Sequence, residues 1–463
     1  MNVAVVVIPL AVRVLSTLVF LPLADCVHGR AVTTSMPPTG GEHQMPWVRA
    51  YPVGVPTTYP YPTVHAVRLL EDAASDFPDA TAVEYRRYRL SYRKLLDHAD
   101  RLATALGNLD VGPGTEVALL LPNCPQLVIA LFAAWRVGAQ VRLLTPRDVP
   151  SLAEMQPRAM IVIDRWYGRY VAPDRRTLGA ATSVVVTGVG DYLPFPDNVL
   201  VPVRQLLRRR RVRIPEANGV FGFADLVRRN LPAPDEPPGS ERMTALASPL
   251  GDVTQRQLVV NSFQLRLWLP DVVAGDERVL LGLPLSSTLG AVWVLTSVLA
   301  AATMILVDDR RASVRQRLAL HARPTLLPID QELGDQLLRP TRRRSTLSSV
   351  RIAVARDALP PQRRHALEEL TDKGRIRRAW GVQGLLTHAD PIYGRYEDGT
   401  VGLPLPDTAL TIADPSHPER PAPPGCRGRL WLRGPQLRGA EWVDTGIDGS
   451  LDAGGYLRVA EDV

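Results

Sequence analysis

Residues 81–146 constrain the fold most, because short β-prone runs alternate with amphipathic helical stretches along them. The β-prone runs are 81–85, 117–121 and 141–144, and each is followed or preceded by turn residues. Continuous apolar runs of this kind are typical of strands that helices cover on both faces. The alternation predicts two successive βαβ units in a parallel sheet with right-handed crossovers, and a ligand crevice at the carboxyl ends of its strands.

The two helical stretches between these runs have recognisable ends. Ser91 precedes the first stretch, and serine is a favoured N-cap. Apolar residues then recur every three or four positions as far as Leu109, which predicts one buried helix face. The second stretch, 126–137, ends before Gly138, a residue suited to the left-handed backbone of a helix C-terminus. Residues 86–89 predict a polar turn ahead of the first helix.

The same alternation returns later in the chain. The expected strands are 279–283, 304–307 and 350–355, and the expected helices are 291–301, 313–321 with Ser313 as its cap, and 360–370. From Gly402 onward the pattern changes to short alternating segments, such as 410–412 and 429–433, separated by Pro and Gly. This change predicts a β-rich part at the end of the sequence.

Three segments in the first half resemble a known superfamily. Residues 90–95, 111–114 and 117–123 are similar to the opening of the adenylate-forming (AMP-binding) enzymes, which include the acyl-CoA synthetases, and the similarity extends from about Met45 to the last residue. Residues 184–196 with 214–226 are more specific, because they resemble an insert of bacterial long-chain fatty-acid-CoA ligases. The resemblance implies an α/β fold of two doubly wound subdomains and a small β-rich subdomain, with the mobile C-terminal domain absent.

The resemblance also implies a division of the chain. Residues 1–44 form an apolar or irregular extension, 45–401 carry the AMP-binding-like α/β subdomains with the ligase-type insert at 184–227, and 402–463 form the β-rich subdomain. The family's following domain bears a lysine used in adenylation and much of the CoA tunnel. That domain is missing from the sequence, so a protein partner that supplies it is one hypothesis.

The motifs that do chemistry in the family match this chain in position but not in residue type. The loop that surrounds phosphates lacks its glycine run and its lysine, and Gly384 stands where the family has the glutamate that serves Mg²⁺. A glycine has no side chain with which to bind a metal. The implied degenerate nucleotide pocket consists of Gly251, Arg356, Asp357, Trp380, Gly381, Gln383, Gly384 and Glu461.

The family's acyl-substrate motif is altered as well. It reads Pro284-Leu-Ser-Ser287 here, and the resemblance implies an acyl pocket formed by Ser287, Leu289 and Gly290. No catalytic residue of the family is retained and no metal site is predicted. ATP with Mg²⁺ and CoA are the cofactors of the family, and the altered motifs put their binding to this chain in doubt.

Two functional interpretations follow, from different classes. The first is a long-chain fatty-acid-CoA ligase-like protein whose adenylation and thioesterification are lost or strongly impaired. The second is a non-catalytic lipid-binding or acyl-binding protein built on the ligase fold, for which a fatty acid or acyl group is the expected ligand. A relic without a selected function stays open as a third reading.

The charge of the chain is moderately basic, with a net charge of +7 and an isoelectric point near 9.5. The four adjacent arginines Arg208, Arg209, Arg210 and Arg211 either bind phospholipid headgroups or form a solvated loop. Nucleic acid is not an expected partner, because no aromatic residues are interleaved to stack bases.

The cysteines and the N-terminus bear on localisation. Cys26, Cys124 and Cys426 form no CxxC pair, which favours a reduced protein without a cysteine metal site. Residues 3–24 are mostly apolar, so they predict either a signal or membrane anchor, or a start codon assigned too early, with the true start at Met36 or Met45. The expected localisation is cytoplasmic or peripheral to a membrane.

Overall fold

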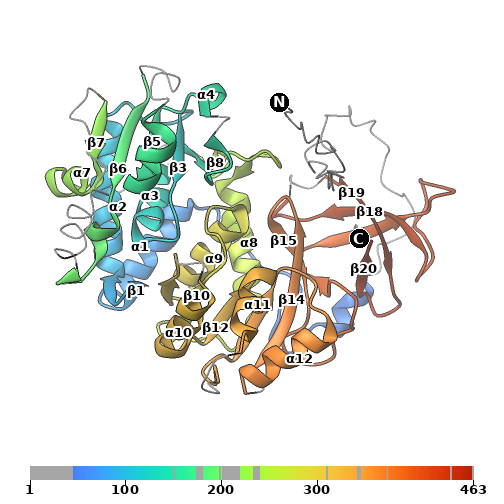
Figure 1. Ribbon diagram of the computed structural model, residues 1–463. Coiled ribbons are helices and arrows are strands. Elements are labelled where there is room, and N and C mark those ends of the chain that lie inside the picture. The colour runs from blue at the N-terminus through green and yellow to red at the C-terminus, as the bar shows by residue number, and fades with distance from the viewer. Residues whose placement is uncertain are drawn as a thin grey trace, which may run out of the picture. The chain divides into compact units, whose positions relative to one another are not determined.

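The computed structural model describes residues 45–149, 152–173, 181–194, 196–197, 200, 219–232, 240–308, 311–340, 346–372, 374–437 and 441–460. The chain divides into two compact units, Met1–Met36 and Pro37–Val463, and every described residue belongs to the second. That unit contains three β-sheets and the helices that cover them (Figure 1).

The first sheet has seven strands. In spatial order they are β7 (Val220–Gly222), β6 (Ser183–Thr187), β5 (Ala159–Ile163), β3 (Glu116–Leu120), β4 (Gln140–Leu143), β8 (Thr244–Leu246) and β9 (Val253–Thr254). All neighbours are parallel except β8 and β9. The central strand β3 is buried at four of its five positions, as its apolar sequence predicts.

The second sheet has nine strands. In spatial order they are β16 (Leu403–Pro404), β15 (Leu385–Ala389), β14 (Arg375–Val382), β13 (Ile352–Ala355), β12 (Leu326–Ile329), β10 (Arg278–Leu281), β11 (Thr303–Leu306), β1 (Thr81–Tyr85) and β2 (Tyr88–Ser91). The strands from β14 to β1 are parallel, and antiparallel strands close both edges.

The third sheet is antiparallel and has four strands, in the order β17 (Ala409–Ala413), β18 (Arg427–Arg433), β19 (Val443–Leu451) and β20 (Leu457–Val459). It lies beside β15 and β14 in Figure 1. The segments 410–412 and 429–433 predicted from the sequence are strands of this sheet.

The helices cover the sheets and fill the space between them. The helices before residue 230 are η1 (Pro46–Ala50), α1 (Ala66–Asp76), α2 (Tyr92–Gly107), α3 (Pro125–Arg136), α4 (Leu152–Met155), α5 (Asp164–Trp166), η3 (Tyr167–Val171), η4 (Val189–Tyr192) and α7 (Phe223–Arg229). The later ones are α8 (Gln255–Trp268), α9 (Thr288–Leu299), α10 (Ala312–Ala322), α11 (Gln331–Leu338) and α12 (Pro361–Leu370). Helices α8 and α9 occupy the centre of Figure 1 and are buried on nearly all sides. No described helix is both long and apolar enough to cross a bilayer.

Several predicted helix ends are confirmed. Helix α2 has Ser91 as its N-cap, and the Ser91 hydroxyl accepts a hydrogen bond from the Lys94 backbone N–H. Gly138 adopts φ +75° just beyond α3, and α12 begins at Pro361. The prediction for Ser313 is wrong: α10 begins at Ala312, so Ser313 lies inside it, and the N-cap position is occupied by Arg311.

The first of the two predicted βαβ units is also wrong. β1 pairs with β11 in the nine-stranded sheet, whereas β3 and β4 belong to the seven-stranded sheet. The reason is a hairpin: Arg86 and Arg87 take positive φ values, and residues 88–91 pair back on β1 as strand β2 rather than completing a turn. Helix α2 then leads to the other sheet. Only β3, α3 and β4 form the predicted unit.

Candidate functional site

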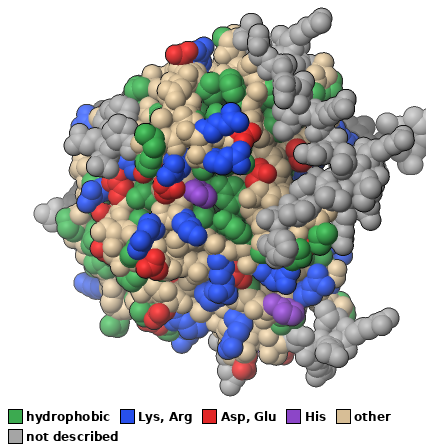
Figure 2. Space-filling model, turned by 90° about the vertical axis from the view of Figure 1, so that its left-hand side faces the viewer, with side chains coloured by type: hydrophobic (Ala, Val, Ile, Leu, Met, Phe, Trp, Pro, Cys, Tyr) green, Lys and Arg blue, Asp and Glu red, His purple; other side chains and the backbone are tan. Residues whose placement is uncertain are grey.

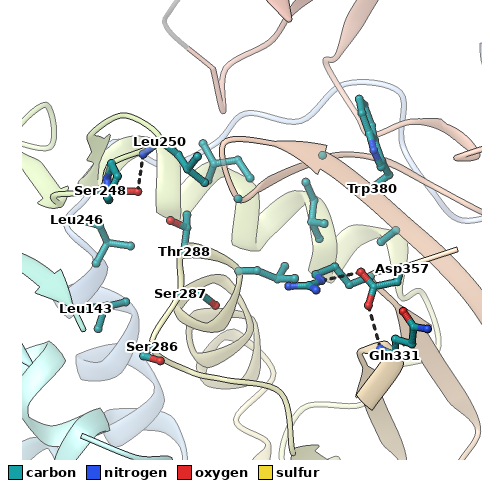
Figure 3. Close-up of a pocket in the computed structure, with 18 of the residues that line it drawn as sticks. Leu143, Leu246, Ser248, Leu250, Ser286, Ser287, Thr288, Gln331, Asp357 and Trp380 are labelled. Atoms are coloured by element: carbon teal, nitrogen blue, oxygen red, sulfur yellow. Dashed lines mark hydrogen bonds and ion pairs between the residues drawn. The ribbon is translucent and has the colours of Figure 1, made fainter. Parts of the chain in front are cut away.

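A cavity of about 890 Å³, the first cavity, lies where the carboxyl ends of the nine-stranded sheet face the seven-stranded sheet (Figure 3). Its lining follows strand ends, as expected for parallel α/β sheets. The contributing segments are Leu143, 246–250, 286–289, Gln331, 356–358, 378–381 and 384–386.

One wall of the first cavity is polar and fixed by hydrogen bonds. Asp357 follows β13, and its Oδ1 accepts a bond from Arg356 Nε at 3.0 Å. Its other oxygen, Oδ2, accepts the Gln331 backbone N–H at 2.9 Å, which ties it to the start of α11. Figure 3 shows these two contacts together on one side of the cavity. This wall therefore carries a pair of opposite charges that are hydrogen-bonded to each other.

The opposite wall is apolar. Leu143 ends β4, Leu246 ends β8, and Leu250 projects from the loop that follows, as Figure 3 shows. The loop is held by the Ser248 hydroxyl, which accepts the Leu250 backbone N–H at 3.2 Å. Leu250 is 62% exposed, so this wall presents a large uncovered leucine.

Lysine is nearly absent from the protein. Of the 54 lysines and arginines, only Lys94 and Lys373 are lysines. Lys94 is exposed on α2, and Lys373 lies outside the described residues. No lysine lines the first cavity among the described residues, and its positive charge comes from Arg356 and Arg378.

The N-terminus of α9 forms the base of the first cavity between these walls. Ser287 is its N-cap: the hydroxyl accepts the Gly290 backbone N–H at 3.0 Å and donates to the Pro284 carbonyl at 2.9 Å. Ser287 and Leu289 line the cavity. Gly290 does not, and its small size has a packing reason, because a Cβ there would stand 2.6 Å from the Leu285 Cα.

Trp380 forms part of the cavity wall and is backed by His388. The two residues face each other across β14 and β15, with ring centroids 5.7 Å apart in an edge-to-face arrangement. Burial lowers the pKa of His388 to about 3, so its imidazole is neutral at physiological pH. Burial raises the pKa of nearby Asp390 to about 6.

Gly384 has no room for a side chain. Its φ is +79°, and a Cβ built on it would stand 2.7 Å from the Thr288 Cβ. Gly381 is equally restricted, because a Cβ there would meet the Leu385 carbonyl oxygen at 1.8 Å. A glutamate at position 384 therefore requires the backbone or Thr288 to shift.

The predicted site residues divide into three groups. Those that line the first cavity are Ser287, Leu289, Arg356, Asp357, Trp380, Gly381 and Gly384. Gly251, Gln383 and Gly290 are adjacent to lining residues without lining it themselves, and Glu461 lies outside the described residues. Sequence reasoning missed Leu143, Leu246, Gln331 and Arg378. The available signal was their position within or just after parallel strands, and Gln331 was missed because strand β12 was not predicted.

A second cavity of about 710 Å³ adjoins the first, and Ser286 lines both. Its charged lining residues are Arg86, Arg147, Arg165, Arg315, Asp308, Asp330 and Glu332. Asn123 lines it too and braces the strand end beside it, donating to the carbonyls of Leu281 and Leu283 and accepting the Leu285 backbone N–H. Among the described residues, no group of three or more His, Cys, Asp or Glu is placed to hold a metal ion.

Comparison with known proteins gives a consistent result. Residues 70–162 and 253–439 match the family model described as AMP-binding enzyme. A long-chain-fatty-acid-CoA ligase of Bacillus subtilis (strain 168) is 27% identical over 455 residues, which cover 91% of this chain and 80% of the ligase. An indoleacetate-CoA ligase of Aromatoleum aromaticum is 24% identical, covering 83% and 73% of the two chains.

Solved structures show the same fold. The crystal structure of a long-chain-fatty-acid-CoA ligase from Archaeoglobus fulgidus superposes with a TM-score of 0.73 at 16% identity, covering 89% of this chain and 86% of that one. An anthranilate CoA ligase in complex with anthranoyl-AMP superposes with a TM-score of 0.71 at 19% identity, covering 87% and 78%.

Proposed function

Because the chain belongs to the AMP-binding enzyme family and is similar to long-chain fatty-acid-CoA ligases, we propose that it binds long-chain acyl ligands without converting them to acyl-CoA at a normal ligase rate. The observation that carries the proposal is the lack of space for a side chain at Gly384. The resemblance places the Mg²⁺-binding glutamate at this position, and here Thr288 fills the volume that such a side chain needs.

The rest of the first cavity supports the same conclusion. MgATP brings concentrated negative charge, which binding sites neutralise with lysine, metal or backbone amides. The loop 244–254 is the one that the family resemblance places around the phosphates. It presents Leu246, Pro249 and Leu250 to the cavity rather than charged or hydroxyl groups alone. On the opposite side, Arg356 and Asp357 hold each other where the family has small residues under the adenine. The described lining therefore does not fit MgATP.

The first cavity has one apolar and one polar wall, which suits a ligand with an apolar chain and a polar head. An apolar wall of Leu143, Leu246 and Leu250 faces a polar wall within one cavity of about 890 Å³. Apolar cavities with a few placed polar groups are the usual sites of small ligands. Arg147 and Arg165 of the second cavity supply donors for the phosphates of a CoA thioester, whereas Arg86 is already paired with Asp308. These donors make acyl-CoA a candidate ligand besides the free acid.

A second function is an active ligase completed by a C-terminal domain on another protein. Trp380 and Gly381 still line a cavity of sufficient size, which favours it. Membrane association through Arg208–Arg211 and an anchor in residues 1–44 stay proposals, because both segments lie outside the described residues. On the face drawn in Figure 2, basic and acidic side chains are interspersed rather than segregated.

The test is an acyl-CoA synthesis assay on the full chain. ATP, Mg²⁺, CoA and palmitate are incubated with the protein, and palmitoyl-CoA and AMP are quantified beside a long-chain ligase of the family. We expect a rate lower by at least about 10³, since loss of one group that stabilises transition-state charge costs about 10²–10³. A rate within tenfold of the reference ligase contradicts the proposal.

A further inference from the structure

A third cavity, of about 790 Å³, lies at a junction of four chain segments. It is lined by Arg242, Asp252, Thr254, Arg256, Gln257, Asp407, Arg433, Gly434, Pro435 and Leu437. These residues come from the turn before β8, the β9 end and first turn of α8, the turn between β16 and β17, and the end of β18. It shares no lining residue with the first cavity.

Three arginines converge on this cavity from different elements. Arg256 lies in the first turn of α8, where its Nη1 donates to the Thr63 hydroxyl at 3.1 Å. Arg433 ends β18, and its guanidinium stacks over the Trp442 ring at 4.9 Å. Within the described part of the chain, neither Arg256 nor Arg433 forms an ion pair, so their charges are not neutralised by a carboxylate in contact. Arg242 is more exposed and pairs only loosely with Glu241, at 3.8 Å.

The two carboxylates of the cavity are occupied elsewhere. Asp407 Oδ2 accepts the Tyr59 backbone N–H at 2.9 Å, and Asp407 itself holds a φ of +60°, a costly conformation for a non-glycine residue. Asp252 Oδ1 accepts the Ser248 backbone N–H at 3.3 Å. Both aspartates thus brace neighbouring loops, and the guanidinium groups remain the ligand-binding charges.

The wall behind the arginines is rigid. Gln436, fully buried, donates to the Thr408 hydroxyl at 2.8 Å and accepts from Gln264 at 3.1 Å, while its carbonyl accepts from Gln257 at 3.2 Å. A satisfied buried amide network holds its strands in one arrangement. Arg256 and Arg433 therefore project from fixed backbone, which lowers the cost of ordering them around a ligand.

We propose that the third cavity is a binding site for a phosphate monoester group carried by a small molecule. Arginine forks match phosphate oxygens, and three of them from separate directions suit a tetrahedral anion. The three arginines and two aspartates sum to a charge of +1, which offsets part of the charge of about −1.5 to −2 that a phosphate monoester carries at neutral pH. A triphosphate brings still more negative charge, most of which this set leaves unneutralised, and Asp252 and Asp407 repel it more strongly than they repel a monoester.

The test uses the full chain and inorganic phosphate as the probe. Calorimetry and thermal unfolding are followed as phosphate is titrated at constant ionic strength set with KCl. We expect saturable binding that raises the unfolding midpoint, because the ligand joins segments that separate on unfolding. Inorganic triphosphate is expected to bind no more tightly than phosphate. Non-saturable behaviour overturns the site, and triphosphate binding ten times tighter overturns the monoester assignment.

Two variants and one matched control locate the binding. Arg433→Gln and Arg256→Gln are each expected to weaken phosphate binding by about tenfold, the effect of losing one charge-assisted contact. Arg427→Gln removes the same charge from an exposed position on the same strand β18, and it is expected to leave the affinity within about twofold. An equal loss in Arg427→Gln means nonspecific charge attraction and contradicts the proposal.

A folding control keeps the result interpretable. If the unfolding midpoint of Arg433→Gln without phosphate falls by more than about 4 °C, the outcome for Arg256→Gln decides. Palmitate binding at the first cavity is measured on the same variants and is expected to be unchanged. Loss of phosphate binding with retained palmitate binding thus separates this inference from the proposed function.

Discussion

Strand β13 keeps the buried apolar pattern of a sheet strand, whereas the two residues that follow it differ from those that the family resemblance implies. Ile352–Ala355 is buried at all four positions and pairs in register with β12 and β14. Arg356 and Asp357, the next two residues, project polar groups into the first cavity where the family resemblance expects small ones. Burial constrains the strand because any polar change there destabilises the fold. Arg356 and Asp357 are more exposed than the strand, so a change of residue type there is less costly to the fold.

The largest expected effect compares a buried leucine with an exposed one. Leu119 in β3 is fully buried, whereas Leu250 on the cavity wall is 62% exposed. Leu119→Ala is expected to lower the free energy of unfolding by about 2–5 kcal/mol, because it removes packed methyl groups and leaves a void. Leu250→Ala is expected to change it by less than about 0.5 kcal/mol while weakening palmitate binding. Urea denaturation measures the free energy of unfolding of both variants. Equal losses in the two would contradict the claim that burial, and not the cavity wall, determines stability.

The next effect concerns the brace between the two sheets. Asn123→Ala leaves the buried carbonyls of Leu281 and Leu283 without their donor, so we expect a loss of about 2–3 kcal/mol in unfolding free energy. Asn108→Ala is the control, since that amide bonds only at the surface, to Asn230. If Asn123→Ala is no worse than the control, the strand ends around the second cavity are held by other contacts.

A pH-dependent change of similar size in the free energy of unfolding is expected from His388 and Asp390, which lie behind the wall of the first cavity. Burial lowers the pKa of His388 from 6.5 to about 3, so its contribution to stability is present above pH 6.5 and is lost as pH falls toward 3. Burial raises the pKa of Asp390 from 3.8 to about 6, so its contribution is present below pH 3.8 and is lost as pH rises through 6. Between about pH 4 and pH 6 the two effects oppose each other.

Asp390→Asn separates these contributions. The amide still accepts the Arg378 backbone N–H, and of these two groups only His388 still contributes to the pH dependence of stability. The unfolding free energy of the variant is then expected to fall by about 3 kcal/mol between pH 6.5 and pH 4, more steeply than in the parent protein. Denaturation at four pH values checks this. A slope no steeper than the parent's would show that His388 and Asp390 do not titrate with opposed signs.

The smallest effect isolates the space at Gly384. Gly384→Ala and Gly425→Ala both place alanine at a positive φ, +79° and +83°, but only the first brings a Cβ against Thr288. We expect Gly425→Ala to cost about 1 kcal/mol and Gly384→Ala about 1 kcal/mol more. Equal costs would mean that Thr288 yields easily, and that a longer side chain fits at position 384.

Sequence reasoning recovered what depends on burial and local geometry. The cap at Ser91, the glycine after α3 and the strands 279–283 and 350–355 follow from residues close in sequence. It did not recover partners distant in sequence: β1 pairs with β11, some 220 residues away, and the short run 81–85 carries no mark of which sheet it joins. Strand β12 contains Pro328, which weakens its strand signal, so Gln331 and its bond to Asp357 were missed.

The most direct measurement is calorimetry of the full chain with palmitate and with MgATP, each alone and then together. The account predicts saturable palmitate binding and no heat of MgATP binding under either condition. MgATP binding that strengthens when palmitate is present would contradict it, because a working adenylation site couples the two ligands, whereas we propose that the first cavity has lost the groups that hold the metal and phosphates.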